Sequence, residues 1–161
     1  RVLSLVKYKP KKSFGKEIAG GWVIQETDLS KMDISAVKTV TKKSPTKAEL
    51  LTLDLAWRAV KHVKSNAIVV AHNKKIISIS GGQTSRVDAV KYALTKTVVP
   101  AGAVIASDAF FPFRDSVDLM SRYGISSIIQ PGGSIRDGDV VAACNEHKIS
   151  MVFTSFRVFK H

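Results

Sequence analysis

Residues 107–115 gather side chains that could bind a flat ligand. The segment holds three phenylalanines, two aspartates, an arginine and a proline, directly after the apolar run 103–106. That run predicts a buried strand, and residues 116–122 predict a helix, so the segment lies where open α/β sheets place ligand crevices. Pro112 restricts the loop, which then presents aromatic faces and a carboxylate on a stiff backbone. One or two of the phenylalanines alternatively belong to the core.

A second turn of this kind follows the next predicted strand, residues 126–130. It begins Pro131-Gly132-Gly133 and leads into a predicted helix. The glycines allow positive φ and close approach of a ligand to the backbone. Amides at the start of the helix could then bind an anion or the polar edge of a ring. Such a turn alone usually marks only a tight connection, but beside the first segment it predicts a binding site.

Two further segments have competing interpretations. Residues 81–86 place two glycines, Thr84, Ser85 and Arg86 at a helix amino terminus, which suits a phosphate. The alternative is an ordinary N-cap by Thr84 or Ser85 with Arg86 solvated. Asn66 follows a predicted helix, where it is either a left-handed helix terminus or an amide that both donates to and accepts from a ligand.

Alternating elements must position these segments. A strand at 2–6, a basic loop at 7–16, a strand at 22–25 and a polar connecting arm at 28–45 come first. Thr46 and Glu49 form a capping box before a helix with apolar residues at helical spacing. A hairpin (67–71 and 75–80) precedes helices at 85–96, 116–123 and 137–147 and strands at 103–107, 126–130 and 150–154. We expect one domain, with residues 1–45 as strand and arm and 46–161 as an α/β core with helices on both faces of a mixed sheet.

Composition restricts the class of protein. The chain has 161 residues, is 45% hydrophobic and has no apolar run long enough to span a membrane. A net charge of +12 indicates either a solvated surface or attraction for polyanions, meaning nucleic acid or small phosphorylated and polycarboxylate substrates. The single Cys144 excludes an internal disulfide and, without a visible signal peptide, predicts a cytoplasmic location. Because Arg1 stands where Met would be, we expect a processed, trimmed or excised chain.

Over essentially its whole length, the chain resembles the AICAR transformylase part of the bifunctional AICAR transformylase/IMP cyclohydrolase family of purine biosynthesis. AICAR is 5-aminoimidazole-4-carboxamide ribonucleotide. Besides the two loops above, the resemblance rests on residues 20–25 (GGWVIQ), 40–43 (VTKK), 63–68 (VKSNAI), 82–87 (GQTSRV) and 157–161 (RVFKH). It matches the carboxyl-terminal part of those enzymes, the second of two cytidine-deaminase-like subdomains. The resemblance implies a three-layer α-β-α domain with a mixed, mostly parallel sheet.

The resemblance also implies an activity and its site. The family transfers a formyl group from 10-formyltetrahydrofolate to the amine of AICAR. The positions that match its AICAR contacts are Asn66, Arg86, Phe110 and Arg157. Those that match its folate contacts are Val87, Phe113, Asp115, Ser134 and Ile135. A carboxylate such as Asp115 suits the amino-pyrimidine edge of a pterin. His161 matches a terminal histidine whose role we leave open, and the basic tail is alternatively mobile surface.

The family's catalytic pair is not found in its proper context. Lys61-His62 mimics a catalytic Lys-His pair, but the family places that pair in a Lys-His-x-Asn-Pro segment, and here Asn-Pro does not follow. We therefore interpret Lys61-His62 as surface and assign no catalytic residue. The base is expected on a second polypeptide or missing segment, within a homo- or hetero-oligomer. His72 and His147 are expected at a turn and a helix end.

Other chemistries find less support. The zinc deaminases need His-x-Glu and Pro-Cys-x-x-Cys, neither of which occurs here, so we expect no metal. A stand-alone relative that binds nucleotide or folate without catalysis is an alternative. A basic nucleic-acid-binding module is a weaker one, because charge alone supports it and no RNP, KH or zinc motif is present.

Overall fold

The computed structural model describes residue 9 and residues 11–161. The strand expected at residues 2–6 lies outside the described residues. The chain divides into two compact units, residues 1–31 and residues 32–161. Within the described part, no helix is long and apolar enough to cross a membrane.

The first unit contains an antiparallel hairpin. Strand β1 (Ser13–Ile18) pairs with β2 (Gly21–Glu26), and Gly20, with φ of +83°, takes the left-handed conformation of the turn. The expected strand at 22–25 is therefore confirmed. The basic loop expected at 7–16 is wrong from Ser13 onward, because pairing with the apolar β2 makes a strand of a sequence too polar to predict one.

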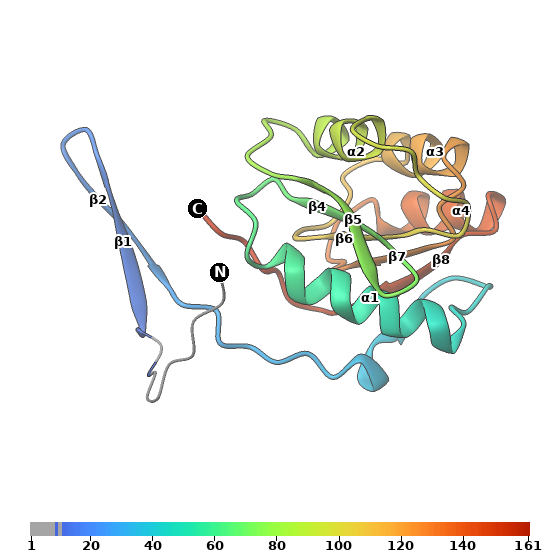
Figure 1. Cartoon of the computed structure of the whole chain (residues 1–161), viewed down its shortest axis with the longest axis horizontal. Coiled ribbons are helices and arrows are strands. Elements are labelled where there is room, and N and C mark those ends of the chain that lie inside the picture. The colour runs from blue at the N-terminus through green and yellow to red at the C-terminus, as the bar shows by residue number, and fades with distance from the viewer. Residues whose placement is uncertain (1–8, 10) are drawn as a thin grey trace. The chain divides into compact units, whose positions relative to one another are not determined.

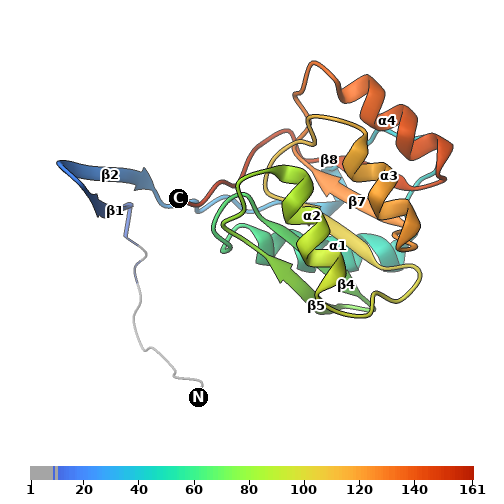
Figure 2. The ribbon, with the colours of Figure 1, turned by 90° about the horizontal axis from the view of Figure 1, so that it is seen from above.

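The second unit is built on a six-stranded sheet in the order β3-β8-β7-β6-β4-β5 (Figures 1 and 2). The strands are β3 (Lys38–Thr39), β4 (Ile68–His72), β5 (Lys75–Ser80), β6 (Val104–Ser107), β7 (Ser127–Gln130) and β8 (Ser150–Phe153). Strands β6, β7 and β8 pair in parallel, β4 is antiparallel to both of its neighbours, and β3 is antiparallel to β8. Strands β5 to β8 therefore share one direction, which confirms a mixed sheet with mostly parallel strands.

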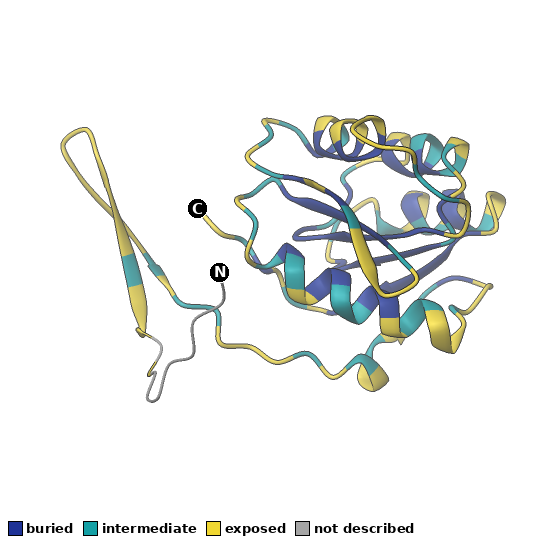
Figure 3. Cartoon of the chain, in the orientation of Figure 1, coloured by how far each residue is buried: buried dark blue, intermediate teal, exposed yellow. Residues whose placement is uncertain are grey.

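Helices cover both faces of this sheet. Helix α1 (Lys47–Val60) lies on one face, and α2 (Arg86–Thr95), α3 (Asp115–Arg122) and α4 (Asp137–Glu146) lie on the other (Figure 1). Side chains along β4 alternate between them, since Ile68 and Val70 pack with α2 to α4 whereas Val69 and Ala71 pack with α1. The dark strands between half-exposed helices in Figure 3 show the resulting core. The expected three-layer α/β architecture is confirmed.

Local signals account for most boundaries. The Thr46 side chain accepts from the amide of Glu49, whose carboxylate accepts from Thr46, so the expected capping box starts α1. Asn73 and Lys74, both with positive φ, form the two-residue turn between β4 and β5. The arm expected at 28–45 is more ordered than predicted, because it contains a short 3-10 helix (Ile34–Ala36) and β3. So short a strand becomes visible only through its pairing with β8.

Candidate ligand-binding site

One edge of the sheet gathers all the predicted site residues. Strands β5 to β8 end at this edge, and β4 begins there because Ile68 pairs with Ser107, the last residue of β6. The first turns of α2, α3 and α4 follow directly from these strand ends. Asn66 precedes β4, Val87 lies in the first turn of α2, and the loops after β6, β7 and β8 hold the other positions. This is the crevice position expected for an α/β sheet.

A buried ion pair organises the centre of this edge. Asp108 is fully buried, and the Arg86 side chain is only 5% exposed. The Asp108 carboxylate accepts hydrogen bonds from Arg86 Nη1, the Ser65 hydroxyl and, at 3.0 Å, the Ala67 amide. Arg86 Nη1 also donates to the Ala67 carbonyl at 3.1 Å. The network ties α2, the start of β4 and the end of β6 together, and it neutralises both charges.

This network changes the interpretation of Arg86. Sequence reasoning placed its guanidinium either on a phosphate or in solvent, with Thr84 or Ser85 as the cap. Ser85 does cap α2, since its hydroxyl accepts from the Asp88 amide at 3.1 Å. The solvated alternative is wrong, because Arg86 is buried against Asp108. Its positive charge is already balanced, which gives it a structural partner in place of the expected phosphate.

Asn66 is held by the same network. Its Oδ1 accepts from Arg86 Nη2 at 2.8 Å, and its Nδ2 donates to the Gln83 carbonyl at 2.9 Å. Helix α1 ends earlier, at Val60, and Asn66 is not among the described residues with positive φ. The left-handed helix-terminus interpretation is therefore wrong. The two bonds leave one amide N–H and one oxygen lone pair for a ligand.

The carboxyl-terminal tail is hydrogen-bonded beside the network. The Val158 amide donates to the Asp108 carbonyl at 3.1 Å, and the Ser65 amide donates to the Lys160 carbonyl at 2.9 Å. The Arg157 guanidinium lies over the Phe110 ring, 4.7 Å from its centroid. Two predicted nucleotide contacts thus meet, and a free surface tail is ruled out for Arg157 to Lys160.

The predicted folate contacts lie on the loops before α3 and α4. Phe113 is 51% exposed, and the Arg136 guanidinium lies 5.3 Å from its ring centroid, beside a cavity of about 210 Å³. Ser134 accepts from the Arg136 amide at 3.1 Å through its hydroxyl, which joins the two loops. Ile135 is fully exposed. The Asp115 carboxylate is exposed and accepts from the Ser116 amide at 2.6 Å through one oxygen, so its other oxygen can accept from a ligand.

The Pro-Gly-Gly turn has the expected conformation and an unexpected use. Gly132 and Gly133 have φ of +72° and +90°. A Cβ on Gly132 would lie 2.4 Å from the Phe153 ring, so the close approach there is made by β8. The Gly133 amide donates to the Asp137 carboxylate at 2.7 Å. Asp137 thus occupies the amide expected to bind an anion.

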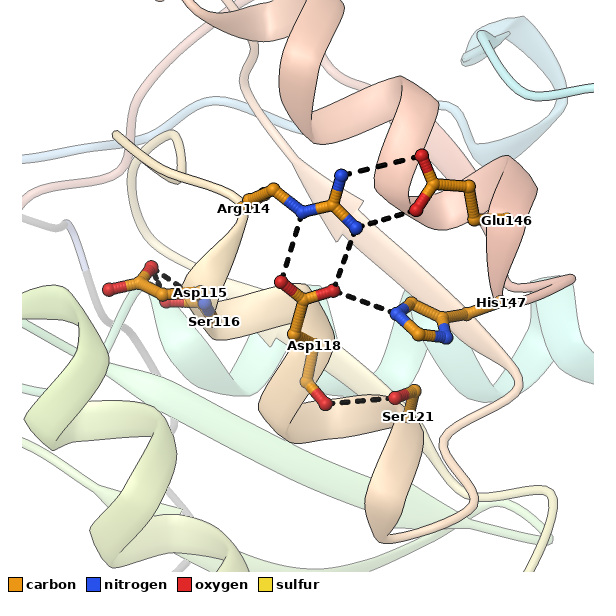
Figure 4. Close-up of polar contacts among 7 residues, drawn as sticks. All are labelled: Arg114, Asp115, Ser116, Asp118, Ser121, Glu146 and His147. Atoms are coloured by element: carbon orange, nitrogen blue, oxygen red, sulfur yellow. Dashed lines mark hydrogen bonds and ion pairs between the residues drawn. The ribbon is translucent and has the colours of Figure 1, made fainter.

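A surface ion network fixes the loop before α3 onto α4 (Figure 4). Arg114 bonds Asp118 at 3.0 Å and Glu146 at 2.6 Å, and His147 Nε2 lies 2.7 Å from Asp118. Hydrogen bonds from Arg114 and then His147 lower the pKa of Asp118 to about 2. The Arg114 guanidinium likewise lowers the pKa of Glu146. His147 ends α4 as predicted, although its contact with Asp118 was not foreseen.

The other histidines add no site. His62 is exposed as predicted, and its carbonyl accepts from Lys160 Nζ at 3.2 Å. His72 is the last residue of β4, beside the expected turn. Across the described residues, no group of three or more His, Cys, Asp or Glu side chains could hold a metal ion.

Asp108 is the residue that sequence reasoning missed. It stood within the first segment but received no role, although a carboxylate directly after a buried strand needs a partner. That requirement was the available signal. The partner, Arg86, lies 22 positions earlier and comes close only when β4 is inserted between β5 and β6.

Comparison with known proteins gives consistent matches. The family model described as "AICARFT/IMPCHase bienzyme" matches residues 1–96. A bifunctional purine biosynthesis protein PurH from Aquifex aeolicus is 49% identical over 150 residues, which cover 91% of this chain and 29% of that protein. The PurH protein of Persephonella marina is 50% identical over 168 residues, which cover 99% of this chain and 32% of that protein. The chain thus spans about a third of the length of the curated relatives it matches.

A solved structure is also similar, though weakly. It is a diaminohydroxyphosphoribosylaminopyrimidine deaminase/5-amino-6-(5-phosphoribosylamino)uracil reductase from Thermotoga maritima. The match has a TM-score of 0.42 and 20% identity, and it covers 63% of this chain and 34% of that one. A similarity of this size carries no argument about fold or function.

Proposed function

The chain belongs to the AICARFT/IMPCHase bienzyme family of purine biosynthesis, and from that membership we propose that it forms part of an AICAR formyltransferase. The formyl donor is 10-formyltetrahydrofolate. One observation carries the proposal: the residues at the family's AICAR and folate positions come from five separate segments and converge on one sheet edge.

The chemistry explains why such a site must orient two ligands. The AICAR amine is a weak nucleophile, because its lone pair is delocalised into the imidazole and the amine is hydrogen-bonded to the neighbouring carboxamide. Its nitrogen attacks the formyl carbon and gives up a proton to a base, while the bond from that carbon to N10 of the folate breaks and N10 takes a proton. Orientation of both substrates and a base are therefore needed.

The two halves of the edge suit the two substrates. On the nucleotide side, Asn66 offers a donor and an acceptor that match a carboxamide beside an amine, and Phe110 with Arg157 offers a ring face and a cation. Arg86 acts there through Asn66, whose orientation it sets. On the folate side, Asp115 accepts from the amino-pyrimidine edge of the pterin, and Phe113 packs on a ring face.

The remaining folate positions contribute mainly shape. Val87 is half-buried in the first turn of α2, and Ser134 and Ile135 are on the loop before α4. The proton acceptor comes from outside these residues, on the Lys-His-x-Asn-Pro segment of the family. A second polypeptide or a longer version of this one supplies that segment, which makes the active species an assembly of two parts.

Formyl transfer tests the division directly. The absorbance change on conversion of 10-formyltetrahydrofolate to tetrahydrofolate, with AICAR present, should be absent for this chain alone. It should appear when the chain is co-expressed with the other two thirds of a PurH relative. Turnover by the isolated chain that His62→Ala abolishes would instead make Lys61-His62 the catalytic pair. Ligand binding without turnover in the complete assembly would favour a binding protein.

Asp115 tests the assignment of the folate side. In the active assembly, Asp115→Ala should weaken folate binding by about 1.5–3 kcal/mol, because a charge-assisted hydrogen bond is lost, and leave AICAR binding nearly unchanged. Asp54→Ala on α1 is the matched control. Calorimetric titrations that showed equal losses for the two ligands would contradict the assignment.

A further inference from the structure

The β1–β2 hairpin carries apolar side chains on both of its faces. Directly paired residues share a face, so the register places Ile18 and Val23 on one side and Trp22 and Ile24 on the other. Ile18 and Val23 are 49% and 43% exposed, and Trp22 and Ile24 are 65% and 73% exposed. Figure 3 colours nearly the whole hairpin as exposed. Both faces therefore have apolar area to bury.

The hairpin does not satisfy this need by itself. The Trp22 indole packs across the strand pair onto Gly15, where a Cβ would lie 3.1 Å from Trp22 Cε3, so only one side of the ring is covered. An isolated two-stranded hairpin is at best marginally stable in water, and contiguous exposed apolar groups mark interaction sites. The polar residues of β1, Lys16 and Glu17, alternate with the apolar ones and do not shield either face.

The two-sided pattern distinguishes between occupants. A second copy of this chain that paired hairpin to hairpin about a two-fold axis would cover one face and leave the other in water. Burial of both faces requires a cleft with two walls. The curated relatives are about three times as long as this chain, so a large part of the family's polypeptide is available to form such a cleft.

We propose that the hairpin is clamped on both faces by the part of the family's polypeptide that this chain does not span. The hairpin is then the arm through which the two parts associate. The inference rests on family membership and on the hairpin's register. It does not depend on which substrates the assembly uses.

The test measures association of the two parts. The full 161-residue chain is co-expressed with the other two thirds of the Persephonella marina relative, and the dissociation constant of the purified complex is obtained by sedimentation. Trp22→Ser/Ile24→Ser alters one face, and Ile18→Ser/Val23→Ser alters the other. Each pair should weaken association by roughly tenfold to a hundredfold, since each removes buried apolar side chains. Leu51→Ser/Val98→Ser, at exposed apolar positions of the second unit, is the matched control and should change it less than about twofold.

Three outcomes would overturn the proposal. They are unchanged association of both face variants, sensitivity of only one face, and a self-associating wild-type chain that either face variant makes monomeric. The last would identify a second copy as the occupant. Thermal unfolding of each variant, followed by circular dichroism, checks that residues 32–161 remain folded. Because association is measured without substrates, an inactive complex that still depends on both faces would refute the formyltransferase proposal and leave this one standing.

Discussion

Removal of the Asp108 carboxylate should destabilise the second unit more than any surface charge change. Asp108 is fully buried, and it accepts from Arg86, Ser65 and the Ala67 amide. Asp108→Ala would leave the Arg86 guanidinium, 5% exposed, without its counter-charge in the core. Breaking a buried pair in this way costs about 3–5 kcal/mol. With a urea dependence of about 1–3 kcal/mol per molar, the unfolding midpoint should fall by at least ~1 M.

A double replacement separates loss of the pair from loss of the site. Asp108→Leu with Arg86→Met removes both charges and should recover at least half of the destabilisation, because apolar residues often replace buried ion pairs at little cost. Asp54→Ala is the control, since its partner Arg58 is 66% exposed, and such a pair contributes about 0.5 kcal/mol or less. Urea unfolding of the four proteins decides the question. A loss below about 1 kcal/mol for Asp108→Ala, or one no larger than that of the control, would refute the reasoning.

Three further predictions concern other parts of the second unit. Gly132→Ala should destabilise it by about 1–3 kcal/mol in urea unfolding, since the new Cβ would enter the Phe153 ring at positive φ, whereas Gly138→Ala, with open space in α4, should be neutral or stabilising; equal effects would contradict this. Burial raises the pKa of Cys144 to about 12, so a thiol reagent should label it only after unfolding, and rapid labelling of the native chain would show that this helix opens. The pKa of Asp118 is lowered to about 2, so its stabilising effect should be complete above about pH 4 and disappear as the pH falls towards 2; Asp118→Asn should remove that part of the acid dependence of unfolding, and an unaltered pH profile would argue against the ion network.

Local sequence patterns were sufficient for most of the elements. Helix α1 follows from Thr46, Glu49 and the apolar spacing behind them, because a capping box and a 3.6-residue period depend only on nearby residues. The alternation of strands and helices after residue 67 predicted the three layers for the same reason. It also put the loops after β6 and β7 at one edge, since the carboxyl ends of parallel strands coincide. The family resemblance, likewise a property of the sequence, is confirmed by the family model over residues 1–96.

Contacts between distant residues could be decided only by the tertiary structure. Strands β1 and β3 are too polar or too short to predict alone, and each is a strand because of its partner. The Asp108–Arg86 pair depends on the position of β4 between β5 and β6, a matter of sheet order that no local pattern contains. That order converts Arg86 from an expected phosphate ligand into a buried counter-charge. A side chain's type limits what it can bind, but burial and neighbours select its partner, and both are set by the packing of the whole unit.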